Sequence, residues 1–393
     1  MRTASSHLLC AIVLLLSLST HVTAQTGLDP NTMGQARVLR AAGEYDAAVD
    51  ILRQFFAHPK DTGVREELGY VVILDGQMAA AQYQFEILRE RSTDPQLRGL
   101  YSAVLRRIID ERSVGISVIF GATPTSNLNH GTDNTTLGSD GGDITPESRR
   151  ISGWQGRIGL RGYVRGNIGA KGRVVFDWRA QRHLYSTLYE PETETELCLS
   201  FSQVNQQSDI GARVFRTDRR RERGNYSRTG VTFFGGKETA PGKRINGFLQ
   251  FSVLNVEDND GKEGLQTLLD VGYTLTPTPA FAYRFGFQVA RVNANIDFRS
   301  YSSLAATLQA NAAFRGGYEL STQAVAGLRH FDRDLDFSRE DSFADISVTV
   351  FNSQFSVGGI VPKLTCTLGA TKSNVALFEA DTRACGVSLS RRF

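Results

Sequence analysis

Hydrophobic and polar positions change their period once along this chain, near Ser113. After that point apolar side chains return at every second position in short runs, as in a β-strand with one apolar and one polar face. Before it they return every three or four positions, as on the buried face of a helix. The clearest alternating runs cover residues 114–120, 154–164, 174–178, 197–201, 281–289, 346–350 and 383–393. This pattern predicts an α plus transmembrane β-barrel fold, in which helices precede about 14 antiparallel strands.

The last run indicates what kind of sheet the strands form. Cys385, Val387, Leu389 and Phe393 fall on one face of this strand, with Arg391 as the exception among them. Small or polar residues fill the other face. A strand that ends on an aromatic residue is typical of the closing strand of an outer-membrane barrel, whose ring lies in the interfacial girdle. We therefore expect Phe393, Leu389 and Val387 to close the barrel and to matter for its assembly.

The connections between the predicted strands are alternately short and long. Short turns are expected at 167–169, 205–208, 240–242, 276–279 and 315–317, and longer loops at 124–150, 184–193, 217–225, 257–264 and 331–341. Outer-membrane barrels have this asymmetry, with short periplasmic turns and longer outer loops. An even strand number would place both ends of residues 113–393 on the periplasmic side. The strands are least distinct between Asn352 and Val361, and a soluble β-sandwich or propeller is the alternative fold.

Residues 25–112 are predicted to form a periplasmic helical domain built from a repeat. The sequence Gly-Glu-Tyr-Asp-Ala-Ala at 43–48 returns 33 residues later as Gly-Gln-Met-Ala-Ala-Ala at 76–81. This spacing is close to that of tetratricopeptide repeats. Small residues would let paired helices approach closely, and larger ones would fill the space between them. The matching positions are Ala36, Leu39, Ala48, Leu52 and Phe55 in the first unit, and Leu68, Gly69, Ala81 and Phe85 in the second. A generic helical hairpin domain is the alternative.

Residues 1–24 have the features of a secretory signal peptide. Arg2 precedes a short apolar core at 8–16, and small residues at 21–24 offer a cleavage site before Gln25. No later segment approaches 18 consecutive apolar residues, so no transmembrane helix is expected. The net charge of +3 is too small for 393 residues to favour a nucleic-acid partner. We expect the chain in the cell outer membrane, with its N-terminal domain in the periplasm.

Three cysteines remain after cleavage of the signal peptide, too few for a disulfide scaffold. Cys366 and Cys385 are placed symmetrically about Val375 and Ala376, where the last hairpin is expected to turn, and alternation puts both on the lipid face. They can either form a bridge or be two small apolar residues that face lipid. A bridge requires Cα atoms within about 7 Å.

The sequence has no motif for catalysis, a phosphate loop or a metal site, and we expect neither an enzyme nor a cofactor. His183 and His330 are predicted near the outer rim. The stretch 258–261 weakly resembles the start of a calcium loop but lacks the downstream Glu, so a surface turn is expected. The acidic residues Glu190, Glu192, Glu194 and Glu196 are expected in a solvated loop that leads into a strand.

Alternation directs many arginines toward the lumen of the predicted barrel. The candidates are Arg157, Arg161, Arg165, Arg173, Asp177, Arg179, Arg213 and Arg284, with Asp270 among them. Large barrels commonly have polar, salt-bridged interiors, which is one interpretation. The other is a pore that handles a polar or acidic passenger. A second arginine cluster, Arg216, Arg219, Arg220, Arg221 and Arg223, is expected in an outer loop, where it could bind lipopolysaccharide phosphates.

Residues 29–393 resemble the surface lipoprotein assembly modifier family in architecture and in two short motifs. The segment Thr125-Ser126-Asn127-Leu128-Asn129 is similar to an Asp-Ser-Asn-x-Asn loop of that family, with Thr125 in place of the usual Asp. The last hairpin is also similar, through 372–375, 377–378, 381–383 and 389–393. The motif residues considered for function are Ser126, Asn127, Asn129, Ser373 and Asn374.

The resemblance implies an outer-membrane translocator that carries particular lipoproteins or related secreted proteins to the cell surface without catalytic residues. The expected partners are outer-membrane lipids and lipopolysaccharide, the passenger, the barrel-assembly machinery and periplasmic chaperones, and a monomer is expected. The helical domain is shorter than in the full family form, which leaves recognition of the passenger open. The alternatives are an exopolysaccharide-export porin, which usually has more repeats and about 16 strands, and a diffusion porin.

Overall fold

The computed structural model describes residues 30–54, 62–129, 150–169, 171–186, 191–205, 207–221, 225–257, 263–295, 299–314, 318–332, 339–352, 355 and 360–392. The predicted signal peptide, Phe55, Glu190, Arg223, the turn at 258–261 and Phe393 lie outside these residues. The chain divides into two compact units. The first comprises residues 1–112 and 314–317, and the second comprises 113–313 and 318–393.

The described part of the first unit is helical. Its helices are α2 (Pro30–Ala42), α3 (Tyr45–Gln54), α4 (Thr62–Leu74), α5 (Met78–Arg91) and α6 (Pro95–Glu111). Gly43 and Gly76 occupy equivalent turns, between α2 and α3 and between α4 and α5, with φ of 80° and 81°. Glycine adopts this left-handed conformation at helix ends without a steric cost. The sequence repeat is thus a repeat of helical hairpins.

Small residues allow close contact between these helices. Ala48 and Ala81 are completely buried, and Leu52 and Phe85 fill the core beside them. A Cβ atom at Gly69 would lie 2.8 Å from the Phe85 ring, so only glycine lets α4 approach α5 this closely. None of the described helices is long and apolar enough to cross a membrane.

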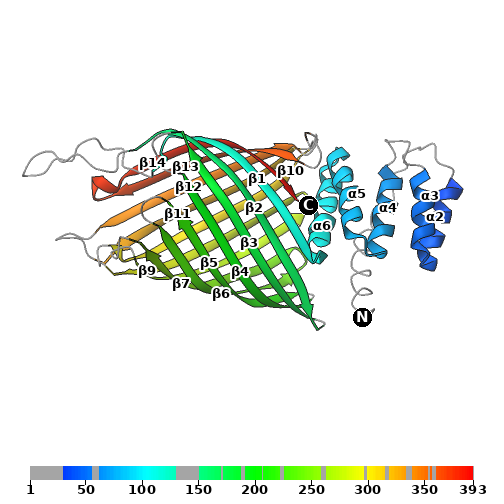
Figure 1. Ribbon diagram of the computed structural model, residues 1–393, viewed down its shortest axis with the longest axis horizontal. Coiled ribbons are helices and arrows are strands. Elements are labelled where there is room, and N and C mark those ends of the chain that lie inside the picture. The colour runs from blue at the N-terminus through cyan, green and yellow to red at the C-terminus, as the bar shows by residue number, and fades with distance from the viewer. Residues whose placement is uncertain are drawn as a thin grey trace, which may run out of the picture. The chain divides into compact units, whose positions relative to one another are not determined.

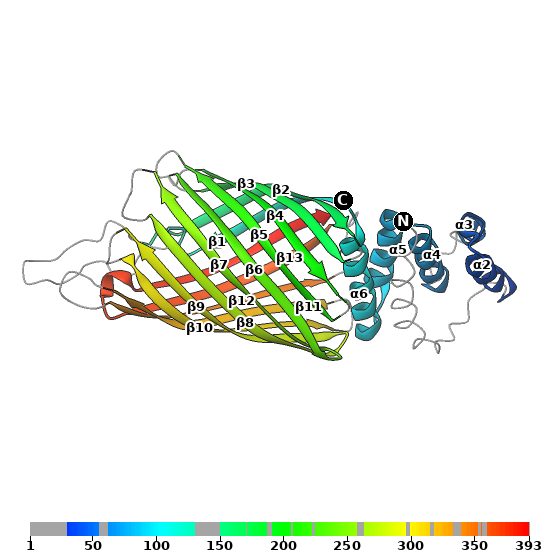
Figure 2. The same cartoon turned by 90° about the horizontal axis from the view of Figure 1, so that it is seen from below.

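The second unit is a closed β-barrel of 14 antiparallel strands, which confirms the predicted fold class (Figures 1 and 2). The strands are β1 (Val114–Thr125), β2 (Gly153–Ile168), β3 (Gly172–Tyr185), β4 (Glu192–Val204), β5 (Ser208–Arg220), β6 (Tyr226–Ala240), β7 (Lys243–Val256), β8 (Gly264–Thr278), β9 (Phe281–Ala294), β10 (Tyr301–Ala313), β11 (Tyr318–Phe331), β12 (Glu340–Asn352), β13 (Val361–Ser373) and β14 (Ala380–Arg392). Each strand pairs with its neighbours in sequence, and β14 pairs with β1 to close the barrel.

Connections of two kinds lie at the two ends of the barrel. One end carries the connections 126–152, 186–191, 221–225, 257–263, 295–300, 332–339 and 374–379, and the other carries 169–171, 205–207, 241–242, 279–280, 314–317 and 353–360. We call these the long-loop end and the short-turn end. The connection 353–360 is longer than the other turns at its end, in the stretch where the sequence pattern was least distinct. The first residue of β1 and the last residue of β14 both lie at the short-turn end.

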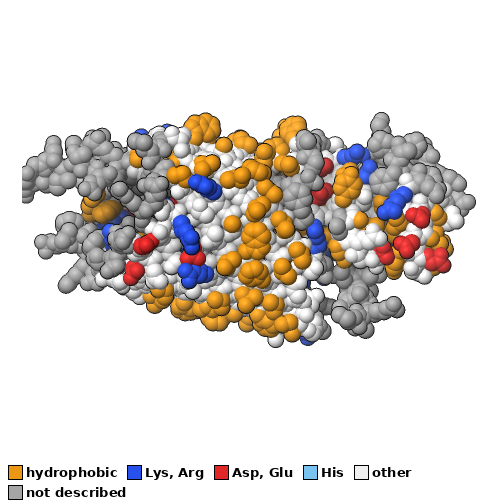
Figure 3. Space-filling model, in the orientation of Figure 1, with side chains coloured by type: hydrophobic (Ala, Val, Ile, Leu, Met, Phe, Trp, Pro, Cys, Tyr) orange, Lys and Arg blue, Asp and Glu red, His pale blue; other side chains and the backbone are white. Residues whose placement is uncertain are grey.

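Many large apolar side chains are exposed on the outer face of the barrel, as the side seen in Figure 3 shows. Trp154, Leu199 and Phe287 are 56%, 54% and 65% exposed, respectively, and similar residues recur on the same face of the other strands. A soluble sandwich or propeller would bury such a face. Around a closed barrel, an exposed apolar belt is the surface that contacts the hydrocarbon of a membrane.

Two expectations about charged residues were wrong. The strand β4 begins at Glu192, so Glu192, Glu194 and Glu196 belong to a strand, and the first two are buried rather than solvated. The strand β5 continues through Arg216, Arg219 and Arg220, so these residues do not lie in a loop. The expectation of loops failed because both segments are strongly polar, although a strand that faces a lumen can be polar at alternate positions.

Candidate functional site: the barrel lumen and its closing seam

The lumen is lined by the residues that alternate with the exposed apolar belt. Along β2, Ile158, Leu160 and Val164 are exposed on the outer face, so Arg157 and Arg161 belong to the inner face. The same alternation places the other predicted luminal residues on inner strand faces: Arg165, Arg173, Asp177, Arg179, Arg213 and Arg284. Charged groups there avoid the cost of contact with lipid.

Glutamates of β4 and an arginine of β3 form one part of the luminal wall. Arg179 Nη2 lies 2.9 Å from Glu194 Oε1 and 2.5 Å from Glu196 Oε2. The side chain of Gln181 donates a further hydrogen bond to Glu194, at 3.0 Å. Because Glu194 and Glu196 occupy alternate positions of β4, both carboxylates reach the same guanidinium.

Arginines at the end of β5 complete this network. Arg219 lies 2.5 Å from Glu192 and 2.6 Å from Glu194, and Arg221 lies 2.5 Å from Glu192. Only 2% of the Glu192 side chain is exposed, so its charge depends on these partners. A cavity of about 620 Å³ lies beside the network and extends across the luminal faces of β3 to β8. In this part of the wall, the negative charges of the glutamates are therefore balanced by the positive charges of their arginine partners.

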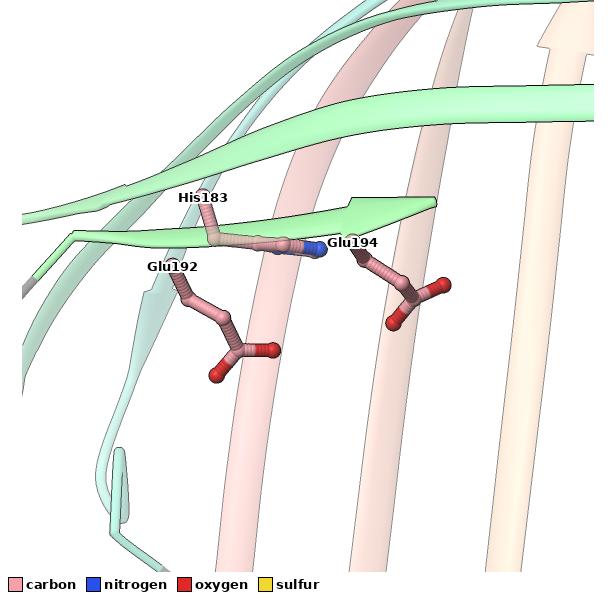
Figure 4. A group of neighbouring side chains, drawn as sticks. All are labelled: His183, Glu192 and Glu194. Atoms are coloured by element: carbon pink, nitrogen blue, oxygen red, sulfur yellow. The ribbon is translucent and has the colours of Figure 1, made fainter. Parts of the chain in front are cut away.

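His183, Glu192 and Glu194 approach one another closely enough to resemble a metal site (Figure 4). Their potential ligand atoms lie within 4.8 Å of one another, and all three side chains are buried. The imidazole Nδ1 lies 2.9 Å from Gln155 Nε2. However, the two carboxylates already bind three guanidinium groups, and a divalent cation would have to displace or adjoin these positive charges. The residues fit an ion-pair network better than a metal centre.

A second buried pair lies farther around the wall. Arg284 of β9 forms an ion pair with Asp270 of β8, and Gln288 donates to the same carboxylate at 3.0 Å. Both charged side chains are largely buried. Asp270 was expected in the lumen beside the arginines, and the structure brings it directly to Arg284.

The seam between β1 and β14 differs from every other strand interface among the described residues. It contains seven residue pairs, from Ser117↔Arg392 to Thr125↔Ala384. The other interfaces contain 11 to 14 pairs each. Pro124 lies in the part of β1 where pairing is interrupted, and proline cannot donate a ladder hydrogen bond. Leu389 and Val387 lie in the seam opposite Phe120 and Ala122.

Gly121 and Ser388 are small residues on the luminal side of the seam, next to the larger Ile119. Gly121 faces Ser388, and a Cβ atom at Gly121 would lie 3.7 Å from the Ser388 Cβ and 4.0 Å from Arg157 Nε. Before the seam begins, Gly115 of β1 lies against the Tyr163 ring of β2, which a side chain at position 115 would displace. The guanidinium of Arg165 lies 4.9 Å above the same ring. The small seam residues are thus bordered by arginines of β2.

The two sequence motifs meet at the long-loop end of the seam. The N–H of Ser126 donates to the Arg383 carbonyl at 2.8 Å, and the Arg383 N–H donates to the Ser126 hydroxyl at 2.9 Å. Asn127 is 2% exposed, and its side-chain amide donates to the Asp381 carbonyl at 3.2 Å. These bonds extend the β1–β14 pairing past the end of the strands. The polar motif residues therefore hold the seam closed at its long-loop end.

The remaining motif residues brace neighbouring connections. Asn129 accepts from the Ile151 N–H at 2.9 Å. Asn374 accepts from the Glu340 N–H at 2.8 Å and donates its own N–H to the Glu340 carbonyl at 3.1 Å, which joins the last hairpin to β12. The hydroxyl of Ser373 accepts from the Val375 N–H at 3.1 Å. The structure thus brings Ser126 and Asn127 to the last hairpin, whereas Ser373 and Asn374 act within it and at its border with β12.

Cys366 and Cys385 form a disulfide between directly opposed positions of β13 and β14, with Cα atoms 4.0 Å apart. Their neighbours on the same faces, Leu364, Leu368 and Val387, are exposed on the outer side of the barrel. The bridge therefore lies on the lipid face of the last hairpin. Of the two alternatives left open by the sequence, the structure has the bridge.

Sequence reasoning missed the network around Glu192 and the role of Asn127. The first could have been found by extending the alternation of β4 toward its N-terminus, which places Glu192, Glu194 and Glu196 on the face of Cys198. Of the second arginine cluster, Arg219 is bound within the network, whereas Arg216 forms an exposed ion pair with Asp218. The cluster is divided between two faces of β5, so it does not form one phosphate-binding loop.

The chain matches one family model and is similar, at low identity, to several solved channel structures. A family model described as "Surface lipoprotein assembly modifier" matches residues 117–393. No curated protein matches this chain. Among solved structures, the outer membrane channel DcaP of Acinetobacter baumannii is 8% identical, with a TM-score of 0.43 and coverage of 71% of this chain and 96% of the channel. The anion-selective porin from Comamonas acidovorans is 10% identical, with a TM-score of 0.40 and coverage of 71% and 98%. The CymD monoaromatic hydrocarbon channel is 11% identical, with a TM-score of 0.37 and coverage of 73% and 90%.

Proposed function

The chain belongs to the surface lipoprotein assembly modifier family, and we propose that this outer-membrane barrel delivers specific lipoproteins or related secreted proteins to the cell surface and performs no chemistry. The observation that carries the proposal is the short β1–β14 seam. A passenger with a lipid anchor must pass from the lumen into the bilayer, and this requires two strands to separate. The seam has the fewest residue pairs to break among the described interfaces.

The lumen supports this route for a polar chain. On the luminal side of the seam, Gly121, Ser388 and Gly386 present no large side chain, and Ile119 is their larger neighbour toward the short-turn end. Arg157 and Arg161 border this surface on β2 and can attract acidic or polar groups of the passenger. Open strand edges in the bilayer leave backbone groups unpaired, so the seam would open only while the passenger occupies it.

The helical hairpins are proposed to receive the passenger on the periplasmic side. Stacked helical repeats form extended surfaces that hold peptides or partner domains. Because both ends of the barrel chain lie at the short-turn end, a periplasmic position of that end would also place the helical unit in the periplasm. Periplasmic chaperones and the barrel-assembly machinery remain the expected transient partners, with lipopolysaccharide around the barrel.

Surface exposure of a candidate passenger tests this function. A lipoprotein encoded beside this chain would be expressed with and without it, and intact cells would be treated with a protease. We expect the lipoprotein to be degraded only when the chain is present. Equal degradation in both strains would contradict the translocator function. If export of a glycan or of small solutes fell in the absence of the chain instead, the function would be that of an exopolysaccharide-export or diffusion porin.

A further inference from the structure

A groove of about 800 Å³ crosses the outer face of the barrel over β10 to β14. Its floor is a row of small residues in direct register. Ala306 pairs with Ala326, Ala326 with Ala344, and Ala344 with Ala370. The row continues to Asp381 on β14, which pairs with Ala370. A row of alanines lowers the surface relative to the large residues on either side.

Large apolar side chains line this groove on the side away from the long-loop end. On the long-loop side of the row, the exposed Leu304 and Leu328 pair with each other outside the lining of the groove, and Ser342 and Lys372 continue that register on β12 and β13. Leu308, Ile346 and Leu368 stand on the other side. This apolar wall is continuous with the apolar belt that faces the membrane. The groove is therefore a furrow in the lipid-facing surface.

The groove has the length and direction of one lipid chain. Four strand spacings separate β10 from β14, or about 19 Å at about 4.8 Å each. Strands of outer-membrane barrels tilt by about 35–45°, so a row at right angles to them rises by about 12 Å along the barrel axis. One leaflet of hydrocarbon is about 15 Å thick. Ala306 lies five residues from the long-loop end of β10, whereas Asp381 lies one residue from that end of β14. The groove thus climbs from within the apolar belt toward the rim.

A cation lines the groove three residues from the long-loop end of β14, and Asp381 lies two residues nearer that end on the same face. Arg383 lines the groove on β14 and is exposed on the outer face. No acidic side chain within the described ranges forms an ion pair with its guanidinium. Lys372 is exposed on the same face of β13, closer to the long-loop end. Arginine at a membrane interface binds phosphate through paired hydrogen bonds.

We propose that this groove binds one acyl chain of an anionic phospholipid, whose phosphate lies on Arg383. The floor is one alanine wide on β10, β12 and β13 and two alanines wide on β11, which fits a single chain and not the flat face of a second barrel. Arg383 and Lys372 together outnumber the Asp381 carboxylate on this face, and the excess positive charge distinguishes a phosphate-bearing lipid from an uncharged acyl anchor. The Arg383 carbonyl accepts a hydrogen bond from the Ser126 N–H, and the Arg383 N–H donates to the Ser126 hydroxyl. The bound lipid therefore lies against the long-loop end of the seam. A ligand that binds only the closed seam stabilises it.

Lipid retention by the purified full-length chain tests the proposal. Native mass spectrometry in detergent would follow the binding of dioleoyl phosphatidylglycerol and of dioleoylglycerol, which lacks the phosphate. We expect one retained phosphatidylglycerol per chain and at least tenfold weaker retention of dioleoylglycerol. Ala344→Leu, which raises the groove floor, should weaken phosphatidylglycerol retention at least tenfold. Ala212→Leu is the matched control, because Ala212 lies on the outer face of β5 opposite Phe201 and Phe233.

Arg383→Gln should reduce retention of phosphatidylglycerol to that of dioleoylglycerol, whereas Arg182→Gln, at an exposed outer position near the same rim of β3, should not. Heat-modifiable mobility would establish that each variant is folded, and Ala326→Leu would replace Ala344→Leu if the latter failed to fold. Equal retention by the Ala344 and Ala212 variants would overturn the groove assignment. Unchanged phosphatidylglycerol retention in Arg383→Gln would overturn the phosphate assignment. A dimer lost on Ala344→Leu would identify a second copy as the occupant.

Discussion

Locking the seam with a disulfide should stop delivery of the passenger while leaving the barrel intact. Gly121→Cys with Ser388→Cys is the preferred pair, because an ideal Cβ at Gly121 lies 3.7 Å from the Ser388 Cβ. Disulfides have Cβ–Cβ distances of about 3.5–4.5 Å, so no backbone movement is required. The new Cβ would meet the Val387 carbonyl at 3.6 Å and Arg157 Nε at 4.0 Å, which are ordinary contacts. Cys198→Ser in the background would remove the remaining free thiol.

The expected size of the effect follows from the seam ladder. If each residue pair contributes about one backbone hydrogen bond of about 1 kcal/mol, seven pairs hold the seam with roughly 7 kcal/mol. The 14 pairs between β2 and β3 would give roughly twice that value. A passenger can offset the smaller cost by its own contacts, but it cannot break a covalent bond. Surface exposure of the passenger should therefore fall at least tenfold in the oxidised variant and return on reduction.

The assay is protease treatment of intact cells, with and without a membrane-permeant reductant. Gly156→Cys with Leu184→Cys is the control, since its ideal Cβ distance is 3.6 Å across the β2–β3 interface. This bond should leave delivery unchanged. Passenger exposure at the wild-type level in fully oxidised Gly121→Cys/Ser388→Cys cells would refute opening of the seam. Equal loss in the control would indicate a general defect in the barrel.

Other predictions concern stability and the native bridge. Glu192→Gln should lower the free energy of unfolding of the barrel by about 2 kcal/mol. This loss is smaller than that expected for a fully buried ion pair, because the arginine partners of Glu192 are partly exposed. The midpoint of heat modification measures the loss, with Glu340→Gln at an exposed ion pair as the control. Cys366→Ser/Cys385→Ser should destabilise the last hairpin by about 3 kcal/mol, and alkylation of unreduced wild-type protein should label neither cysteine. Burial raises the pKa of Glu66 in the helical unit, so the folded state favours its protonated form. The stability of that unit should therefore fall as pH rises from the unfolded pKa of about 4.3 through the folded pKa. Glu66→Gln should stabilise the unit at pH 7 but not below pH 4, as measured by helix melting in the full-length chain. An equal gain in stability at both pH values would contradict the burial effect.

Alternation was sufficient to predict the barrel, because every strand has one face in lipid and one in the lumen. The spacing of Cys366 and Cys385 about the last turn also placed them opposite each other. The alternation did not identify which luminal charges pair. Arg179 meets Glu194 and Glu196 only because β3 and β4 align in one register, and that register depends on the length of the connection between them.

The groove and the seam were beyond prediction for a related reason. Ala306, Ala326, Ala344 and Ala370 are dispersed over 64 residues of sequence and form a row only through three strand registers. The shortness of the seam depends on where β14 ends relative to β1. By contrast, Gly43 and Gly76 could be assigned to equivalent helix turns, since the φ angle that each turn requires is a local property.

The position of the Cys366–Cys385 bridge on the lipid face sets an order of events during biogenesis. A water-soluble oxidant can reach the two thiols only while the hairpin is still in the aqueous compartment, because hydrocarbon surrounds them afterwards. The bond must then form before insertion and fix β13 against β14 in one register. A slip of one residue would reverse which face of β14 meets lipid. The lipid-facing and lumen-facing sides of β14 are thus fixed before the strand enters the membrane, and β1 then pairs with its free edge.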